Sequence, residues 1–117
     1  MLEERAKELG RQIGQSPEYQ GLKRSSEMLN EDREAVALLQ QMEKLRGEAQ
    51  RLIQRGENPT PEMEQQLDSM LEKIQIQPAY QRAVTAQENF DKLMLRVNQW
   101  IMDGMKKGAA SPIITLG

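Results

Sequence analysis

The chain has 117 residues, a formal net charge of −2, and neither cysteine nor histidine. Without these two residue types, thiol catalysis, disulfides, iron–sulfur ligation and Cys/His zinc sites are excluded. Only 3% of the residues are aromatic although 38% are hydrophobic, so burial must come from Leu, Met, Ile and Ala on helix faces. We therefore expect an all-α, elongated helical bundle that is oligomeric, because a thin bundle has too little interior to shelter its own apolar surface.

The first two helices are marked by periodicity and by a start signal. Residues 2–14 predict an amphipathic helix, because apolar residues recur at steps of four and three at Leu2, Ala6, Leu9 and Ile13. Ser16 as N-cap and Pro17 as first helical residue predict a second helix that ends near Leu29. Its expected inner face comprises Tyr19, Leu22, Ser26 and Leu29.

The third helix is expected over about 31–55. Asn30 is the expected N-cap, and Gly56 supplies the left-handed conformation that ends helices. Its apolar stripe has the helical period and comprises Ala35, Leu38, Met42, Leu45, Ala49 and Leu52. At ~1.5 Å per residue this helix is about 37 Å long, so it needs partners along its whole length.

Two proline-containing breaks define the remaining helices. Thr60 and Pro61 predict the start of a fourth helix, and Pro78 predicts the start of a fifth over about 79–104. The fifth has a stripe that matches the third in period, with Ala79, Ala83, Ala86, Phe90, Leu93, Val97 and Trp100. These two long helices suit coiled-coil packing, either inside one chain or between chains. Residues 1–108 then form one helical domain, and 109–117 a flexible C-terminal tail.

Candidate functional residues lie on the apolar stripes. We expect an interface that includes Leu38, Met42, Leu45, Phe90, Leu93, Val97, Trp100, Ile101 and Met105, since Trp and Met are enriched in interface cores. Catalytic, cofactor-binding and metal-binding residues are not expected. The serines have no imidazole to activate them, and the acidic group Glu31, Asp32 and Glu34 is explained by the positive end of a helix dipole.

The expected partners are other copies or related helical chains. A cytoplasmic location is expected, because no apolar run reaches the length of a membrane span and the N-terminus lacks a signal peptide's apolar centre. Two alternatives to an interaction protein remain. One is a chaperone-like or scaffold coiled coil, and the weaker one is an RNA-binding accessory protein that uses Arg82, Lys92, Arg96 and the terminal lysines. Few rings are present for base stacking, which disfavours direct nucleic-acid binding.

The order of motifs resembles the YlbF/YmcA family of small helical bacterial regulators. Three stretches carry the resemblance: Leu9-Gly10 followed by Ser16-x-Glu18-Tyr19-x-x-Leu22, then Asp32-x-Glu34-Ala35-x-x-Leu38-Leu39, and finally Gln77-Pro78 leading to Tyr80, Ala83, Phe90, Leu93 and Val97. The match extends from about Leu9 to Ile101.

The resemblance implies an all-helical protein that associates with itself or with relatives and has no catalytic activity. Members of the family influence competence, sporulation, biofilm formation and messenger-RNA processing. Some members use C-terminal cysteines to hold an iron–sulfur cluster. This chain departs from them there, because it has no cysteine, and a cluster-dependent role does not carry over.

Overall fold

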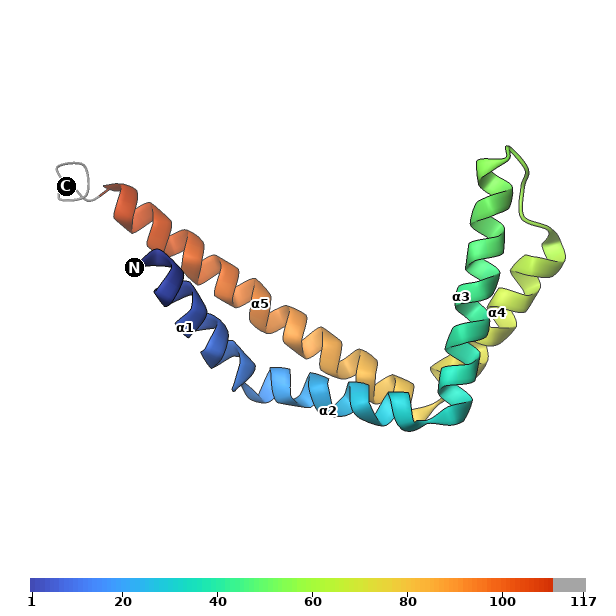
Figure 1. Ribbon diagram of the computed structural model, residues 1–117, viewed down its shortest axis with the longest axis horizontal. Helices are drawn as coiled ribbons and strands as arrows, with labels where there is room; N and C mark the ends of the chain where they lie inside the picture. The colour runs from blue at the N-terminus through green and yellow to red at the C-terminus, as the bar shows by residue number, and fades with distance from the viewer. Residues whose placement is uncertain (111–117) are drawn as a thin grey trace.

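The structure, a computed structural model, describes residues 1–110, and these form five α-helices joined by short connections (Figure 1). The helices are α1 (Leu2–Gly14), α2 (Pro17–Glu31), α3 (Arg33–Gln54), α4 (Pro61–Gln75) and α5 (Pro78–Ala110). The expectation of an all-α fold with five helices is confirmed. Residues 111–117, which belong to the expected tail, lie outside the described residues, and α5 includes 109 and 110.

Local capping chemistry places most helix ends where the sequence predicts them. The Ser16 hydroxyl accepts a hydrogen bond from the Tyr19 N–H at 3.1 Å, with Pro17 as the first residue of α2. The Thr60 hydroxyl does the same for the Met63 N–H at 3.2 Å. Gly56 has φ +80° beyond the end of α3, a conformation that glycine adopts without steric cost.

The start of α3 differs from the prediction. Asn30 lies inside the last turn of α2, and the cap is Asp32, whose carboxylate accepts a hydrogen bond from the Ala35 N–H at 3.0 Å. Asn and Asp are equally good N-cap residues, so residue type alone does not predict which of Asn30 and Asp32 is the cap. Asp32 has an extended backbone, with φ −82° and ψ 102°. This single extended residue is where the chain changes direction between α2 and α3.

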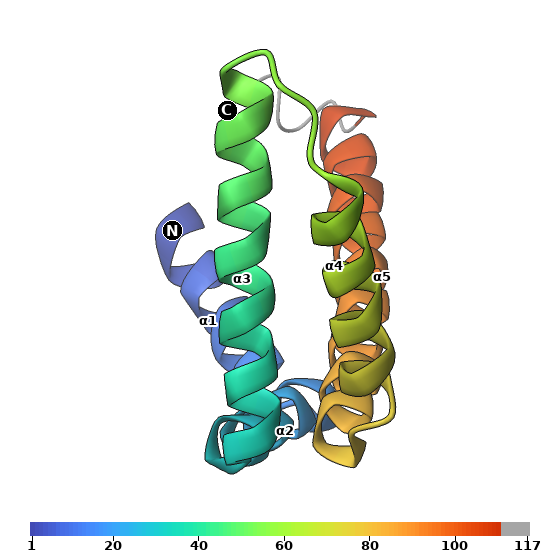
Figure 2. The same cartoon turned by 90° about the vertical axis from the view of Figure 1, so that its right-hand side faces the viewer.

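The helices form two arms that diverge from one junction (Figure 1), and Figure 2 shows α3 and α4 side by side in the arm that faces the viewer. One arm contains α1, α2 and α5, and the other contains α3 and α4; α5 packs on α2, and α3 packs on α4. The two longest helices, α3 and α5, therefore do not pack along one another, and the alternative of coiled-coil pairing inside one chain is wrong. The stripe of α3 is covered by α4, the next helix in the chain, and the stripe of α5 by α2, which is distant in sequence.

The buried core is small and lies mainly in the α3–α4 arm. Ala35, Met42 and Ile74 form its buried cluster, with Ala35 and Ile74 fully inaccessible. Partly buried apolar side chains surround it: Leu29, Leu38, Leu39, Met70, Leu71 and Tyr80. The spacing of the α3 stripe thus predicts burial correctly at its first three turns.

The molecule is elongated, with extents of 65 × 37 × 19 Å and a radius of gyration of 21.3 Å. A compact domain of this length would have a radius of gyration of about 13 Å. Its accessible surface of 9515 Å² also exceeds the roughly 6,500 Å² expected for a compact protein of the same mass. Each arm is only about two helices thick, so many apolar side chains remain in contact with solvent.

Candidate interaction surface

The candidate interface residues of α3 are covered by the chain itself. Met42 and Leu45 are 3% and 8% exposed, and Leu38 is half-buried against the cluster that contains Ile74. Packing between α3 and α4 explains the period of this stripe. These three side chains therefore belong to the fold of the second arm.

The candidate residues of α5 divide at Val97. Phe90 and Leu93 are half-buried, and Val97 is 4% exposed, on the part of α5 that packs on α2. Beyond this point the side chains of Trp100 and Met105 are 61% and 63% exposed. The same stripe that forms the arm's core continues past the helix that covers it.

We call the exposed apolar side chains near the end of α5 the apolar end: Trp100, Ile101, Met102 and Met105. The first turn of α1 lies at the same end of the arm, away from α3 and α4 (Figure 1). Leu2 in that turn is 85% exposed, and α1 contributes no buried residue. Exposed apolar side chains that gather at one end of an arm are typical of an interaction site.

The opposite side of α1 is charged and exposed. Glu3 pairs with Lys7, and Glu8 pairs with Arg11, whose Nε donates a hydrogen bond to the Glu8 Oε2 at 3.0 Å. This hydrogen bond lowers the pKa of Glu8 below its ordinary value and raises that of Arg11. The charges thus mark the solvent side of α1, whereas on its apolar side Leu9 and Ile13 are half-buried and Leu2 is exposed.

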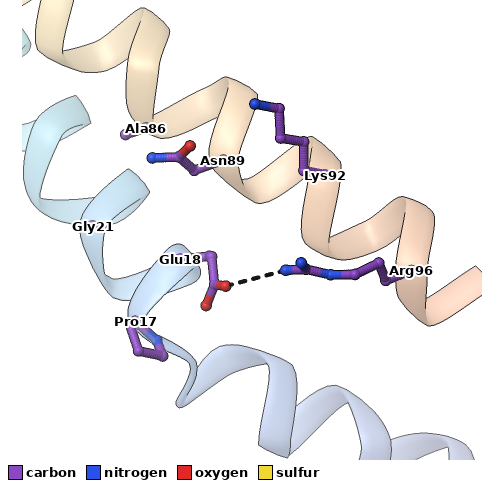
Figure 3. A pocket seen from close by; sticks show the side chains of 7 residues that line it. All are labelled: Pro17, Glu18, Gly21, Ala86, Asn89, Lys92 and Arg96. Atoms are coloured by element: carbon purple, nitrogen blue, oxygen red, sulfur yellow. Dashed lines mark ion pairs between the residues drawn. The ribbon is translucent and has the colours of Figure 1, made fainter.

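A second surface feature is a groove between α2 and α5, which we call the basic groove. It consists of two adjoining hollows that share Ala86 and Asn89. Its charged lining residues are Glu18, Arg24, Arg82, Lys92 and Arg96, which gives a net charge of +3. Figure 3 shows the Glu18 carboxylate directed at the Arg96 guanidinium across one hollow, with a separation of 3.7 Å.

Small residues create this groove. Gly21 lines it from α2, and a Cβ placed there would meet no atom within 4 Å. Sequence reasoning identifies Arg82, Lys92 and Arg96 as a basic set, but it does not place Glu18, Gly21 or Asn89 beside them. The helical spacing of the basic residues along α5 is the sequence signal that indicates one wall of the groove. The other wall comes from α2, more than 50 residues earlier in the chain.

Within residues 1–110, acidic side chains do not gather in a group of three or more that would hold a metal ion. Helices of the described chain also lack a segment long and apolar enough to cross a membrane.

The fold and surface define a small all-α protein of two thin arms, with an apolar end and a basic groove on one of them. Residues 2–106 match the family model described as control of competence regulator ComK, YlbF/YmcA. The chain belongs to the YlbF/YmcA family, as the motif resemblance indicates. It is therefore a member of a regulatory family.

Relatives from streptococci support the same placement. A UPF0342 protein of Streptococcus mutans is 37% identical over 83 residues, which cover 71% of this chain and 74% of the relative. A UPF0342 protein of Streptococcus gordonii is 29% identical over 98 residues, which cover 84% of this chain and 88% of the relative. The similarity thus extends over most of both proteins.

Proposed function

We propose that this chain is a non-catalytic helical regulator that acts by associating with a second copy or a related chain through the apolar end. The observation that carries the proposal is Trp100, whose side chain is 61% exposed beside three other exposed apolar residues of α5. Trp is among the residues that contribute most to binding energy in protein interfaces. Full burial of an exposed Ile or Met side chain, such as the neighbours of Trp100, contributes about 1.5–3 kcal/mol.

The shape of the molecule supports association over catalysis. Buried polar or charged side chains are absent from residues 1–110, whereas active sites hold functional groups in partly desolvated clefts. The large accessible surface relative to mass leaves apolar area that a partner would cover. The family is described by control of the competence regulator ComK, and we propose that association through the apolar end is how this chain takes part in such control.

The test compares two exposed apolar positions on α5. Trp100→Glu introduces a charge into the apolar end, whereas Leu95→Glu introduces one at a residue that is 62% exposed elsewhere on the same helix. We expect Trp100→Glu to weaken association at least about tenfold, because a charged group at an interface core loses its hydration. Leu95→Glu should leave association unchanged, and neither should alter helix content.

Multi-angle light scattering over a range of concentrations measures the mass of each variant. A wild-type chain that remains monomeric at high micromolar concentration contradicts the proposal. Equal effects of the two substitutions contradict the assignment to the apolar end. In the native cell, Trp100→Glu should change the level of the competence regulator in the same direction as deletion of the gene.

A further inference from the structure

The charges of the two arms are complementary. On the first arm, the basic groove between α2 and α5 has four cations and one carboxylate. On the second arm, α4 has four carboxylates and one cation, Lys73. A positive surface and a negative surface attract each other, whereas either surface repels a second copy of itself.

The acidic residues of α4 form a regular stripe. Glu64, Asp68 and Glu72 follow one another at steps of four residues, and all three are exposed. This spacing places their carboxylates on one side of the helix, about 6 Å apart along its axis. The ion pairs of residues 1–110 are Lys7–Glu3, Arg11–Glu8 and Arg96–Glu18, so the stripe has no cationic partner within the described chain.

The cations of the basic groove are similarly free. Arg24, Arg82 and Lys92 are exposed and form no ion pair within residues 1–110. Arg96 contacts Glu18 at 3.7 Å, which is long for a charge-assisted hydrogen bond. Lys92 and Arg96 are four residues apart, the same step as the α4 stripe, so two consecutive pairs match in register.

The lengths of the two surfaces also match. The groove extends along α5 from Gln81 to Arg96, about 22 Å at the helical rise. Helix α4 has 15 residues, which is also about 22 Å. Gly21 and Ala86 leave space in the floor of the groove, as a third helix needs in order to approach a helix pair.

The α4 of the same chain does not reach this groove, because the two arms diverge from their junction (Figure 1). We propose that α4 of a second copy docks in the basic groove, with its stripe of Glu64, Asp68 and Glu72 against Lys92, Arg96 and the neighbouring arginines. Each copy has one groove and one α4, so a two-fold symmetric pair makes this contact twice. The inference rests on the proposed function, since it names the second surface that self-association uses.

The test reverses each set of charges separately. Lys92→Glu with Arg96→Glu makes the groove acidic, and Glu64→Lys with Asp68→Lys makes the stripe basic. Each double variant alone places like charges opposite each other, and we expect its self-association to weaken at least about tenfold. Mixed in equal amounts, the two variants have opposite charges at both contacts, and association should return to the wild-type level.

Matched controls change the same number of charges on the exposed side of α3. Lys44→Glu with Arg46→Glu controls for the loss of cations, and Glu43→Lys with Glu48→Lys controls for the loss of anions. Neither should change association. Wild-type association should also weaken as ionic strength rises from about 0.01 M to about 1 M, because the Debye length falls from about 30 Å to about 3 Å. Circular dichroism verifies that each variant is folded.

The outcomes separate this inference from the proposed function. If the wild type associates, Trp100→Glu dissociates it, and the mixed charge variants remain monomeric, the inference is overturned and the proposed function stands. A monomeric wild type overturns both. If the mixture remains monomeric and the wild type shifts a labelled single-stranded RNA that the Lys92→Glu, Arg96→Glu variant does not shift, the groove binds nucleic acid and the inference is again overturned.

Discussion

The ring of Tyr19 on α2 meets the ring of Phe90 on α5 edge to face, with centroids 5.7 Å apart and planes at 62°. This geometry aligns the positive edge of one ring with the negative face of the other. Phe90 is half-buried, whereas Tyr19 is 39% exposed. The pair connects two helices that are distant in sequence, in an arm whose described residues include one buried apolar side chain, Val97.

A double-mutant cycle measures this contact. Tyr19→Leu and Phe90→Leu each preserve an apolar side chain and remove the ring pair. We expect a coupling free energy of about 0.5–1.5 kcal/mol between the two positions in urea denaturation. If the two losses in the free energy of unfolding are additive, the rings stabilise the fold only through the burial of each ring and not through contact with each other.

The cluster in the second arm predicts a large difference between two isoleucines. Ile74 is fully inaccessible and Ile76 is 73% exposed, although they are two residues apart. Ile74→Ala should lower the free energy of unfolding by about 2–5 kcal/mol, because it leaves a cavity next to Met42 and Ala35. Ile76→Ala should change it by less than about 0.5 kcal/mol. Chemical denaturation followed by circular dichroism measures both, and comparable losses would contradict the packing of α4 on α3.

Helix positions could be predicted from the sequence because they depend on local chemistry. Ser16-Pro17 and Thr60-Pro61 begin helices at the expected residues, since capping and proline geometry involve only neighbouring residues. The arrangement of the arms could not be predicted, since it depends on the backbone at Asp32, where one extended residue turns the chain. For the same reason periodicity identified Val97 and Trp100 as one stripe, but did not reveal that α2 covers the first and leaves the second exposed.

Gly47 and Gly56 offer a test of backbone conformation. Gly47 lies inside α3, and a Cβ added there would meet no atom within 4 Å. Gly47→Ala should therefore raise the free energy of unfolding by about 0.5–1 kcal/mol, the difference in helix propensity. Gly56 has φ +80°, so Gly56→Ala should lower it by about 1–2 kcal/mol. Thermal and urea denaturation measure the sign of the change in the free energy of unfolding for both variants. A loss of self-association in Gly47→Ala without a loss of stability would instead place a partner helix against α3.

The junction between the arms provides the last prediction. Asp32 accepts the Ala35 N–H at the start of α3, whereas Asn30 lies within the last turn of α2. Asp32→Ala should lower the free energy of unfolding by about 0.5–2 kcal/mol, because it leaves a helix N–H without its side-chain acceptor and removes a negative charge from the positive end of the dipole. Asn30→Ala should change it by less than about 0.5 kcal/mol. Urea denaturation compares the two variants, and amide exchange at Ala35 reports the lost hydrogen bond directly. A larger loss in Asn30→Ala than in Asp32→Ala would indicate that Asn30 is the N-cap of the third helix, as the sequence predicts. The turn between the arms would then lie at Asn30 and not at Asp32.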